Sequence, residues 1–262
     1  MEQDLVTIAI LAKDKAHVLP LYLQLIEKQT YPASRINLYI RTNNNNDRTK
    51  EILEEWVERE GGRYHEVHFD ASDVEEPVQD YTPHDWNDLR LRVMGRVRQE
   101  SIEWAKSRDS HYFVPDCDNF IIPETLERLL TTHLPVVGPL LRVAESPLSY
   151  YSNFHHETDD YGYFKSSGLY MEYLFQHVKG LVEVNVIHCT YLMRREILDH
   201  VQYEDGSGRH EYVIVSDGLR KAGIPQYLDT RKKYGMLTFC DTEEQFLPLD
   251  LTGDNFEQRN GG

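Results

Sequence analysis

The sequence predicts an α/β protein with a doubly wound, mostly parallel, Rossmann-like sheet flanked by helices. Residues 5–12 (LVTIAILA) form a continuous apolar run rich in β-branched residues, which is typical of a strand buried on both faces, and the run over 36–42 (INLYIRT) is interpreted as a second buried strand. Segments with apolar residues at helical spacing follow each run, so strands and helices alternate. With 262 residues, of which 40% are hydrophobic, the chain can bury a core of this kind.

The first half of the chain follows the order β-α-β-α-β and then adds a long helix and a fourth strand. After the strand over 5–12, we expect a helix over 17–29, a strand over 36–42, a polar turn over 43–49, a helix over 49–62, a strand over 64–69, an exposed acidic loop over 70–85, a helix over 87–106 and a strand over 111–114. Paired glycines end the second helix, and two prolines mark the acidic loop.

The second half has a less regular pattern. The elements expected there are a strand over 135–142, an aromatic and polar loop over 146–164, a strand running into a helix over 182–198, a helix over 210–224 closed by Gly223, and a last strand over 225–230. We find no internal repeat and no linker, so the chain is predicted to form a single domain over residues 1–262 with an acidic tail over 241–262.

Charge and composition exclude several classes of function. The net charge of −16 argues against nucleic acid and anionic membranes as partners. The apolar run at residues 5–12 is too short to cross a bilayer, and no basic segment precedes it, so we expect no membrane insertion and a cytoplasmic location, which fits a microbial or viral source. The three cysteines, Cys117, Cys189 and Cys240, do not form a disulfide framework.

Two aspartates, Asp116 and Asp118, directly follow the predicted fourth strand. Ligands of open α/β sheets bind beyond the carboxyl ends of the strands, where the polar turns after the first two strands are also expected. Paired carboxylates suit Mg²⁺ or Mn²⁺, which can neutralise a diphosphate leaving group. The alternative is an exposed aspartate turn that caps the helix beginning near Pro123.

Other common catalytic and nucleotide-binding motifs are absent. The chain contains no GxxxxGK[ST], GxGxxG, GxSxG or HExxH sequence, which excludes the corresponding P-loop, dinucleotide, hydrolase-elbow and zinc-protease signatures. A nucleotidyltransferase also uses paired carboxylates, but the turn LAKDKAHVLP lacks the glycine-rich signature that such enzymes need. A nucleotide-diphosphate site built from carboxylates and a metal remains, as in glycosyl transfer from a nucleotide sugar.

Several linked motifs resemble the collagen galactosyltransferase family, which are glycosyltransferase family 25-like proteins. They include LAKDKAHVLPLYLQLIEKQTYP, TNNNNDRTKEILEEW, HYFVPDCDNFIIPETLERLL, VIHCTYLMRRE and KKYGML, in a similar order and spacing over about residues 5–240. The resemblance implies a GT-A fold, a UDP-sugar donor and a Mn²⁺ requirement. It also implies that residues 1–120 bind the nucleotide and that residues 121–240 carry acceptor binding and catalysis.

The resemblance assigns a role to each matching position. Asp116 and Asp118 are expected to bind the metal and the diphosphate. The residues expected to bind the donor are Ala12, Lys13 and Asp14 facing uridine, Asn43 and Asp47 along the nucleoside, Arg98 at a phosphate, and Asn119 beside the metal. The sequence departs from the family at Asn43, where an acidic residue is common, and at His210-Glu211, where paired aspartates are common.

Glu211 and His188 are the candidate catalytic residues. If transfer inverts the anomeric centre, Glu211 is the candidate base for the acceptor hydroxyl, with Asp217 as a rival; the alternative role for Glu211 is to stabilise its helix N-terminus. His188 would polarise the acceptor or complete the metal shell, unless it is a hydrogen-bonded core histidine. The alternative role for Arg98 is a surface ion pair with Glu100 or Glu103.

The predicted activity is metal-dependent transfer of a hexose, galactose first and glucose second, from a UDP-sugar to a hydroxyl. The acceptor is expected to be a protein or glycan, with hydroxylysine of a collagen-like protein implied by the resemblance. The aromatic candidates for contacts with sugar or acceptor are Trp86, Tyr150, Tyr151, Tyr161 and Tyr163. The alternative from another class is a catalytically silent GT-A domain that binds nucleotide or a partner as a scaffold.

Overall fold

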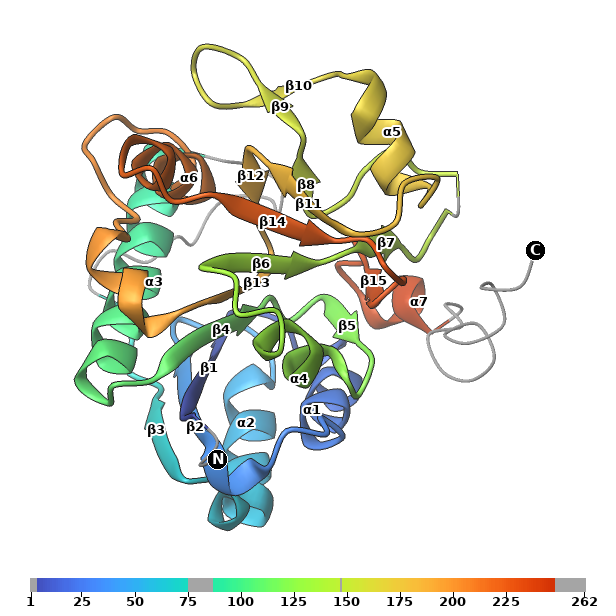
Figure 1. The fold of residues 1–262 in the computed structure, drawn as a ribbon. Coiled ribbons are helices and arrows are strands. Elements are labelled where there is room, and N and C mark those ends of the chain that lie inside the picture. The colour runs from blue at the N-terminus through green and yellow to red at the C-terminus, as the bar shows by residue number, and fades with distance from the viewer. Residues whose placement is uncertain (1–3, 75–86, 147, 248–262) are drawn as a thin grey trace.

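The computed structural model describes residues 4–74, 87–146 and 148–247, and within them the central element is an eight-stranded sheet (Figure 1). The strand order is β11-β14-β6-β13-β4-β1-β2-β3. The strands are β1 (Val6–Ala12), β2 (Ile36–Thr42), β3 (Glu66–Asp70), β4 (His111–Pro115), β6 (Val136–Pro139), β11 (Leu181–Val184), β13 (Thr190–Met193) and β14 (Gln226–Asp229). β3, β2, β1 and β4 run parallel, as do β14 and β6, while β13 and β11 are antiparallel to their neighbours. The predicted mostly parallel sheet is therefore confirmed.

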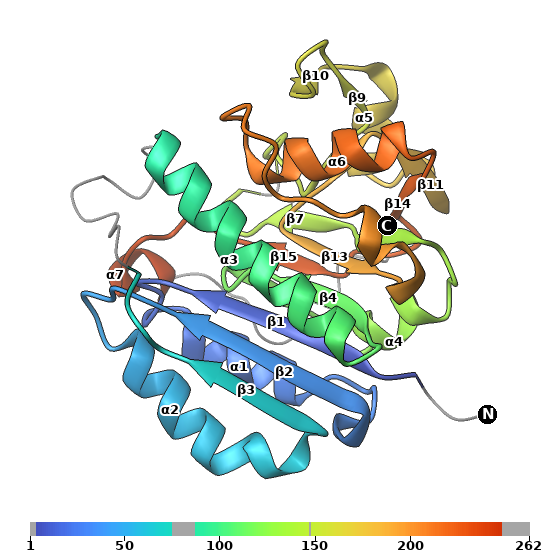
Figure 2. The ribbon, with the colours of Figure 1, turned by 90° about the vertical axis from the view of Figure 1, so that its left-hand side faces the viewer.

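Helices cover both faces of this sheet. The α-helices are α1 (Leu19–Glu27), α2 (Thr49–Glu60), α3 (Asp88–Ser107), α4 (Thr125–Leu130), α5 (Gly168–Leu174), α6 (Glu211–Lys221) and α7 (Glu243–Phe246). Figure 2 shows α3 in front of β1 and β2, with α1 behind them. The core explains this arrangement, because Ile8 on β1 packs in one hydrophobic cluster with α1 and α2, while the next residue, Ala9, packs in a second cluster with α3. Adjacent side chains of a strand point to opposite faces, so a continuous apolar run fits a strand covered on both sides.

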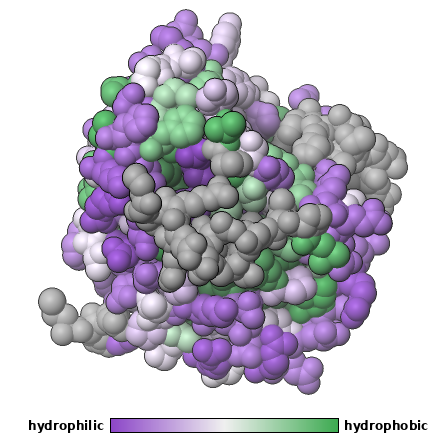
Figure 3. All heavy atoms as spheres, turned by 90° about the vertical axis from the view of Figure 1, so that its right-hand side faces the viewer, coloured by the Kyte–Doolittle hydropathy of each residue, from purple (hydrophilic) through white to green (hydrophobic). Residues whose placement is uncertain are grey.

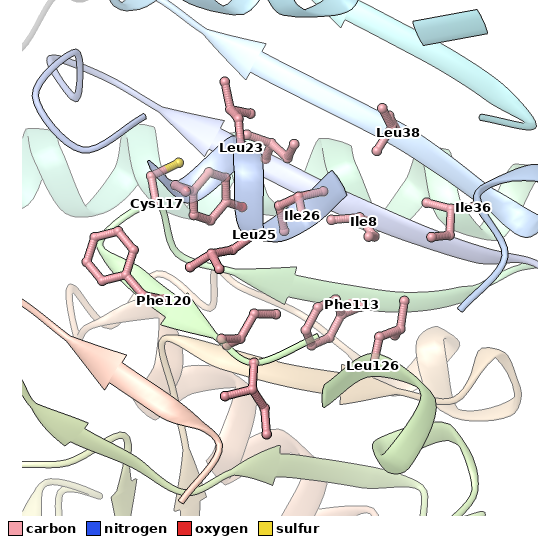
Figure 4. Packing of buried hydrophobic residues seen from close by; sticks show 14 of the residues in the cluster. Ile8, Leu23, Leu25, Ile26, Ile36, Leu38, Phe113, Cys117, Phe120 and Leu126 are labelled. Carbon is pink, nitrogen blue, oxygen red and sulfur yellow. The ribbon is translucent and has the colours of Figure 1, made fainter. Parts of the chain in front are cut away.

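The cluster between α1, α2, α4 and the sheet is shown in Figure 4. Ile8, Leu23, Ile26 and Phe113 are at most 3% exposed and pack together there. Full burial of each such side chain stabilises the fold by about 1.5–3 kcal/mol. Cys117 belongs to the same cluster, so its side chain packs in the core.

The second half departs from the predicted elements in several places, among them α5, where no helix is predicted. The strand expected over 135–142 is divided at Leu140, because β6 stays in the central sheet and β7 (Leu141–Val143) joins a separate sheet with β5 (Asn119–Ile121) and β15 (Gly235–Leu237). The segment 182–198, predicted to be one strand running into a helix, forms three strands, β11, β12 (Val186–Ile187) and β13, which are followed by the 3₁₀ helix η3 (Arg195–His200). β14 is not the last strand, since β15 follows it.

The remaining elements are short. They are η1 (Ala33–Arg35), η2 (Gly61–Arg63), β8 (Phe154–His155), β9 (Glu157–Thr158) and β10 (Phe164–Lys165). The long helix is close to its predicted bounds, because the side chain of Asn87 accepts a hydrogen bond from the backbone N–H of Arg90 and caps α3. Gly223 follows α6 with a φ of +70°, the left-handed conformation in which glycine closes a helix. The acidic loop expected over 70–85 lies mostly outside the described residues.

Figure 3 views the side on which β15 and α7 lie in Figure 1. Hydrophobic patches stand out there among mostly hydrophilic described side chains. None of the helices in the described residues has the length and apolar character needed to cross a bilayer.

Candidate active site at the carboxyl edge of the sheet

The turns after β1 and β2 are tied to each other at one edge of the sheet. The Asp14 carboxylate accepts a hydrogen bond from the backbone N–H of Asn46 at 2.6 Å, and the Asn45 side chain accepts one from the backbone N–H of Asp14 at 3.1 Å. Asp14 has a φ of +52°, and these bonds hold that uncommon conformation. The predicted convergence of the two polar turns is therefore confirmed.

The aspartate pair lies at the same edge, directly after β4. Between the two aspartates, Cys117 is turned into the core (Figure 4). The backbone N–H of Asp116 donates to the carbonyl of Cys189 at 2.9 Å, and the backbone N–H of Thr238 donates to the carbonyl of Asp118 at 3.0 Å. Two distant segments of the chain thus fix the backbone that carries the two carboxylates.

Each carboxylate has one cationic partner. Arg98 donates to Asp116 at 2.7 Å, and the Lys15 ammonium donates to Asp118 at 2.9 Å. Burial nevertheless raises the pKa of Asp116 to about 6, because desolvation and the negative charge of Asp118 outweigh the effect of Arg98. Burial is the largest cause of this rise, and the hard oxygen donors of the pair fit a divalent ion such as Mn²⁺ or Mg²⁺.

Arg98 is a buried residue and not part of a surface ion pair. It is 6% exposed, and its Nε lies 3.6 Å from Oε1 of Glu211, in addition to the bond to Asp116. Burial alone would lower the pKa of Arg98, but the nearby carboxylates hold it well above its usual value. The alternative partners Glu100 and Glu103 are wrong, because the side chain points inward from α3 to the site.

Glu211 lies in the first turn of α6 and is 7% exposed. Its Oε1 faces Arg98, whereas its Oε2 is buried and has no hydrogen-bond partner among the described residues. A buried carboxylate oxygen without a partner is costly, so this atom is available to a ligand. The rival candidate, Asp217, forms ion pairs with Arg209 and Lys221.

His188 is 5% exposed and lies beside Cys189, which has a φ of +64°. Its Nδ1 lies 2.9 Å from the Cys189 sulfur, while its Nε2 is buried with no hydrogen-bond partner in the described part of the chain. Burial, aided by the ring of His155 and by Arg98, lowers the pKa of His188 well below its usual value. The imidazole is therefore neutral and able to bind a hydroxyl.

Few side chains of the described residues are available as ligands for a metal ion. Within residues 4–74, 87–146 and 148–247, no three or more His, Cys, Asp or Glu side chains are grouped closely enough to hold an ion. The described structure therefore does not place His188 in a ligand cluster with Asp116 and Asp118. Mg²⁺ and Mn²⁺ accept few protein ligands and complete their shell with phosphate and water, so two carboxylates remain a sufficient protein contribution.

The residues predicted to bind the nucleoside lie at this edge of the sheet. They differ in whether their side chains are already bonded within the protein. Ala12 ends β1, and Asn43 follows β2 and is 8% exposed. Lys13 pairs with Asp14 at 2.6 Å. Asp47 uses both oxygens on backbone N–H groups, those of Ala16 and Thr49, so it organises the turn.

Asn119 is 2% exposed, and its side chain donates to the hydroxyl of Thr190 at 2.8 Å. This bond connects β5 to β13 directly behind the aspartate pair. Asn119 directly follows Asp118 in the chain, and its amide N–H is already used inside the protein.

Sequence reasoning missed two residues of the site, Lys15 and His155. Lys13 was the predicted lysine of the first turn, but Lys15 is the one that reaches Asp118. His155 is 8% exposed, its ring centroid lies 5.2 Å from that of His188, and burial lowers its pKa to about 4. A weak signal for Lys15 was its place in the same polar turn, whereas no sequence pattern indicated His155.

Among the aromatic candidates, Tyr151 lies nearest to the site, with its ring centroid 5.9 Å from that of His188. Tyr163 contacts His210, the residue that precedes Glu211. Tyr150 contacts Phe175 away from the aspartates, and Tyr161 is 73% exposed. Trp86 lies outside the described residues.

A cavity of about 620 Å³ lies elsewhere, between α3 and the edge strand β3. Tyr39, His68, Trp104 and Glu100 are among its lining residues. None of the predicted site residues lines it. The carboxyl edge of the sheet therefore remains the candidate site on chemical grounds.

Residues 3–252 match the N-terminal domain of glycosyltransferase family 25. The chain belongs to this family. Human procollagen galactosyltransferase 2 is 30% identical over 96% of this chain, and a mouse protein named inactive glycosyltransferase 25 family member 3 is 31% identical over 94% of it. The chain spans only about two fifths of the length of these relatives, 41% and 43% respectively.

Solved structures confirm the GT-A fold of this family member. Residues 1–349 of S. aureus TarS in complex with UDP superpose with a TM-score of 0.58 at 13% identity, covering 98% of this chain and 74% of that one. GalNAc-T7 with UDP, GalNAc and Mn²⁺ gives a TM-score of 0.55 at 12% identity, covering 90% and 43%. At these identities the likeness concerns the fold, and the chemistry of the site has to be argued from its own residues.

Proposed function

We propose that this chain is a UDP-sugar-dependent hexosyltransferase that moves galactose, or alternatively glucose, to an acceptor hydroxyl. The observation that carries the proposal is the aspartate pair at the carboxyl edge, where burial keeps the pKa of Asp116 high although Arg98 and Lys15 are close. Such a site favours a divalent cation. Family membership and the names of the relatives support galactose as the sugar.

Asp116 and Asp118 would hold Mn²⁺, or Mg²⁺ in its place. When bound, the ion neutralises the charge that develops on the UDP leaving group. Lys15 adds positive charge on the Asp118 side. Ala12, Lys13, Asp14 and Asn43 are proposed to face the nucleoside, and Asp47 supports them by holding the turn.

Glu211 is proposed as the base. Arg98 lies at its Oε1 side and orients the carboxylate, while the unpartnered Oε2 is free to take the proton from the acceptor hydroxyl. The neutral His188 can bind the same hydroxyl through its unpartnered Nε2. Arg98 is thus proposed to act through the two carboxylates; direct contact with a phosphate remains a second possible role, served by its unpartnered Nη1.

We further propose that residues 1–262 form one catalytic domain, with the nucleotide half over 1–120, the acceptor half over 121–240 and the acidic tail over 241–262. The acceptor half supplies Glu211 and His188, which supports this division. A collagen-type polypeptide is the proposed acceptor, because relatives carry the name procollagen galactosyltransferase.

A catalytically silent domain is the second candidate. The specific observation in its favour is the relative named inactive, which is as similar to this chain as the relatives named galactosyltransferases. A silent domain would bind UDP but would not turn over any donor.

Release of UDP from a panel of UDP-hexoses with Mn²⁺ tests the proposal. We expect turnover that requires Mn²⁺ and that falls at least about 100-fold in Asp118→Ala, since this residue acts in the electrostatic stabilisation of the leaving group. Asp199→Ala is the matched control, because Asp199 is an exposed aspartate paired with Lys106. UDP binding without turnover of any donor would favour the silent domain, and equal turnover in Asp118→Ala would refute the metal site.

A further inference from the structure

The cavity of about 620 Å³ between α3 and β3 has a floor from the sheet and a wall from the helix. Tyr39 of β2 and His68 of β3 are paired in register, so their side chains point to the same face of the sheet. Arg96, Glu100 and Trp104 follow one another at intervals of four residues, which places them on one face of α3. Figure 2 views the face of the sheet on which α3 lies, and β3 is seen there beyond the helix. The volume of the cavity is typical of a site for a small molecule.

Three aromatic side chains of the cavity contact one another. The rings of Tyr39 and His68 are stacked, with their centroids 5.0 Å apart and 22° between their planes. The centroid of the Trp104 ring lies 5.7 Å from each of them. Burial, with the charge of Glu100 as the next cause, raises the pKa of Tyr39 to about 12, so this ring is uncharged at pH 7. The faces of aromatic rings are partially negative and attract cations.

One of these rings already binds a guanidinium of the chain itself. Arg108 does not line the cavity, but its Cζ lies over the Trp104 ring, 4.5 Å from the centroid. Its Nη2 and Nε donate hydrogen bonds to the two carboxylate oxygens of Glu66, at 2.7 and 3.1 Å. A planar guanidinium suits this combination, because it stacks on a ring and forks onto a carboxylate at the same time. Arg108 therefore shows which chemical group the rings and carboxylates of this region accept.

The cavity offers carboxylates for a further cation. Its lining residues include four acidic side chains, Asp70, Glu100, Glu103 and Glu204, against one arginine, Arg96. Asp70 and Glu103 are paired with cations of the protein, at 3.4 and 3.2 Å. Glu100 and Glu204 have no ion-pair partner within residues 4–74, 87–146 and 148–247. Two negative charges at the cavity are thus left without a counter-charge from the described chain.

Glu204 comes from the segment after η3 and packs against α3 at Gly95. A Cβ added at Gly95 would lie 2.8 Å from Cγ of Glu204 and 3.0 Å from the carbonyl oxygen of Tyr203. The glycine therefore allows the glutamate to lie close to the helix that carries Glu100. The two unpaired carboxylates thus reach the cavity from different segments of the chain.

We propose that this cavity binds a small organic dication that carries a guanidinium group and no anionic group. Its guanidinium stacks on the rings, as that of Arg108 does on Trp104, and its two charges are neutralised by Glu100 and Glu204. An anionic group on the ligand would be repelled by the acidic lining. The inference does not rest on the proposed function, because none of the residues proposed to bind UDP or the acceptor lines the cavity.

Isothermal titration with agmatine, which has a guanidinium at one end and an ammonium at the other, tests this site. We expect saturable binding that Glu100→Gln and Glu204→Gln each weaken about fivefold or more, because each removes a charge-assisted contact. Trp104→Leu should weaken it about twofold or more, through loss of the cation–π contact. The matched control is Glu58→Gln, because Glu58 is also an exposed helical glutamate without an ion-pair partner among the residues that the structure describes. It should leave the affinity for agmatine unchanged.

Four results would overturn the proposal. The first is equal affinity in Glu100→Gln, Glu204→Gln and Glu58→Gln, because the net charge of −16 alone would then attract the ligand. The second is the absence of saturable binding to the unmodified chain below about 10 mM agmatine. The third is equally tight binding of L-arginine, which adds a carboxylate to the same guanidinium. The fourth is tighter binding of the peptide acetyl-Gly-Arg-Gly-amide, which would identify a polypeptide as the occupant.

Discussion

Replacement of Arg98 by alanine should destabilise the protein strongly. The variant removes a 2.7 Å bond to Asp116 and a 3.6 Å contact with Glu211, and it leaves both carboxylates in a buried site without their shared cation. Two unit charges about 4 Å apart interact by roughly 4 kcal/mol at an effective dielectric constant near 20, and removal of one partner of a buried pair typically costs about 3–5 kcal/mol. We therefore expect a loss of about 3–5 kcal/mol in the free energy of unfolding.

Urea denaturation followed by circular dichroism measures this loss. The control is Arg59→Ala, in which an exposed arginine paired with Glu60 and Glu27 is removed; its effect should be much smaller, since water screens such pairs. Arg98→Ala combined with Glu211→Gln should regain part of the stability, because the uncompensated charge is also removed. A loss below about 1 kcal/mol in Arg98→Ala, the size of an ordinary substitution, would refute the view that Arg98 holds the two carboxylates together.

Three further predictions concern other parts of the molecule. The pKa of His155 falls from 6.5 to about 4 on folding, a difference of 2.5 units, so between pH 6.5 and pH 4 only the unfolded chain gains the proton. The free energy of unfolding should therefore decrease by up to about 3 kcal/mol as the pH falls through this range. Urea midpoints measured at several pH values should decrease less steeply in His155→Gln than in the unmodified chain, and identical slopes would contradict this. Gly235→Ala should lower the melting temperature, because the added Cβ would lie 2.0 Å from the carbonyl oxygen of Phe120. Gly168→Ala is the control and should leave the melting temperature unchanged, because no atom lies within 4 Å of its added Cβ. Equal melting temperatures in the two variants would count against the packing of β15 on β5. Without nucleotide, Lys15→Gln should bind Mn²⁺ more tightly than the unmodified chain, because no ammonium then competes for Asp118. Titration with Mn²⁺, followed by electron paramagnetic resonance of the free ion, measures this affinity. Weaker binding in the variant would show that Lys15 does not compete with the ion.

The elements of the parallel half were predictable because each has a signal of its own. Residues 5–12 are almost entirely apolar, residues 36–42 carry Ile36, Leu38 and Ile40 at every second position, and α3 has both a long apolar stripe and a capping asparagine, Asn87. The segment 182–198 has no such signal. Its strands are two to four residues long and lie in two sheets, and the turn between β12 and β13 places Cys189 at a φ of +64°, which its residue type does not predict.

The candidate site was predictable in its position and less so in its contacts. The rule that ligands bind at the carboxyl ends of parallel strands brings the three polar turns together. The direction of the chain at Asp14 decides which lysine reaches Asp118. Hydrogen bonds to Asn45 and Asn46 fix that direction, and these contacts between distant residues cannot be read from the order of residues in the first turn. The burial of Arg98 likewise depends on Glu211, which is far away along the chain.

The central claim is that Asp116 and Asp118 hold a divalent cation that binds the diphosphate of UDP. Isothermal titration of UDP with and without Mn²⁺, in the unmodified chain and in Asp118→Asn, tests it most directly. The account predicts UDP binding that requires Mn²⁺ and that is at least about tenfold weaker in Asp118→Asn, a loss of about 1.4 kcal/mol or more. UDP affinity that is the same in Mn²⁺ and in EDTA, or the same in both proteins, would contradict it.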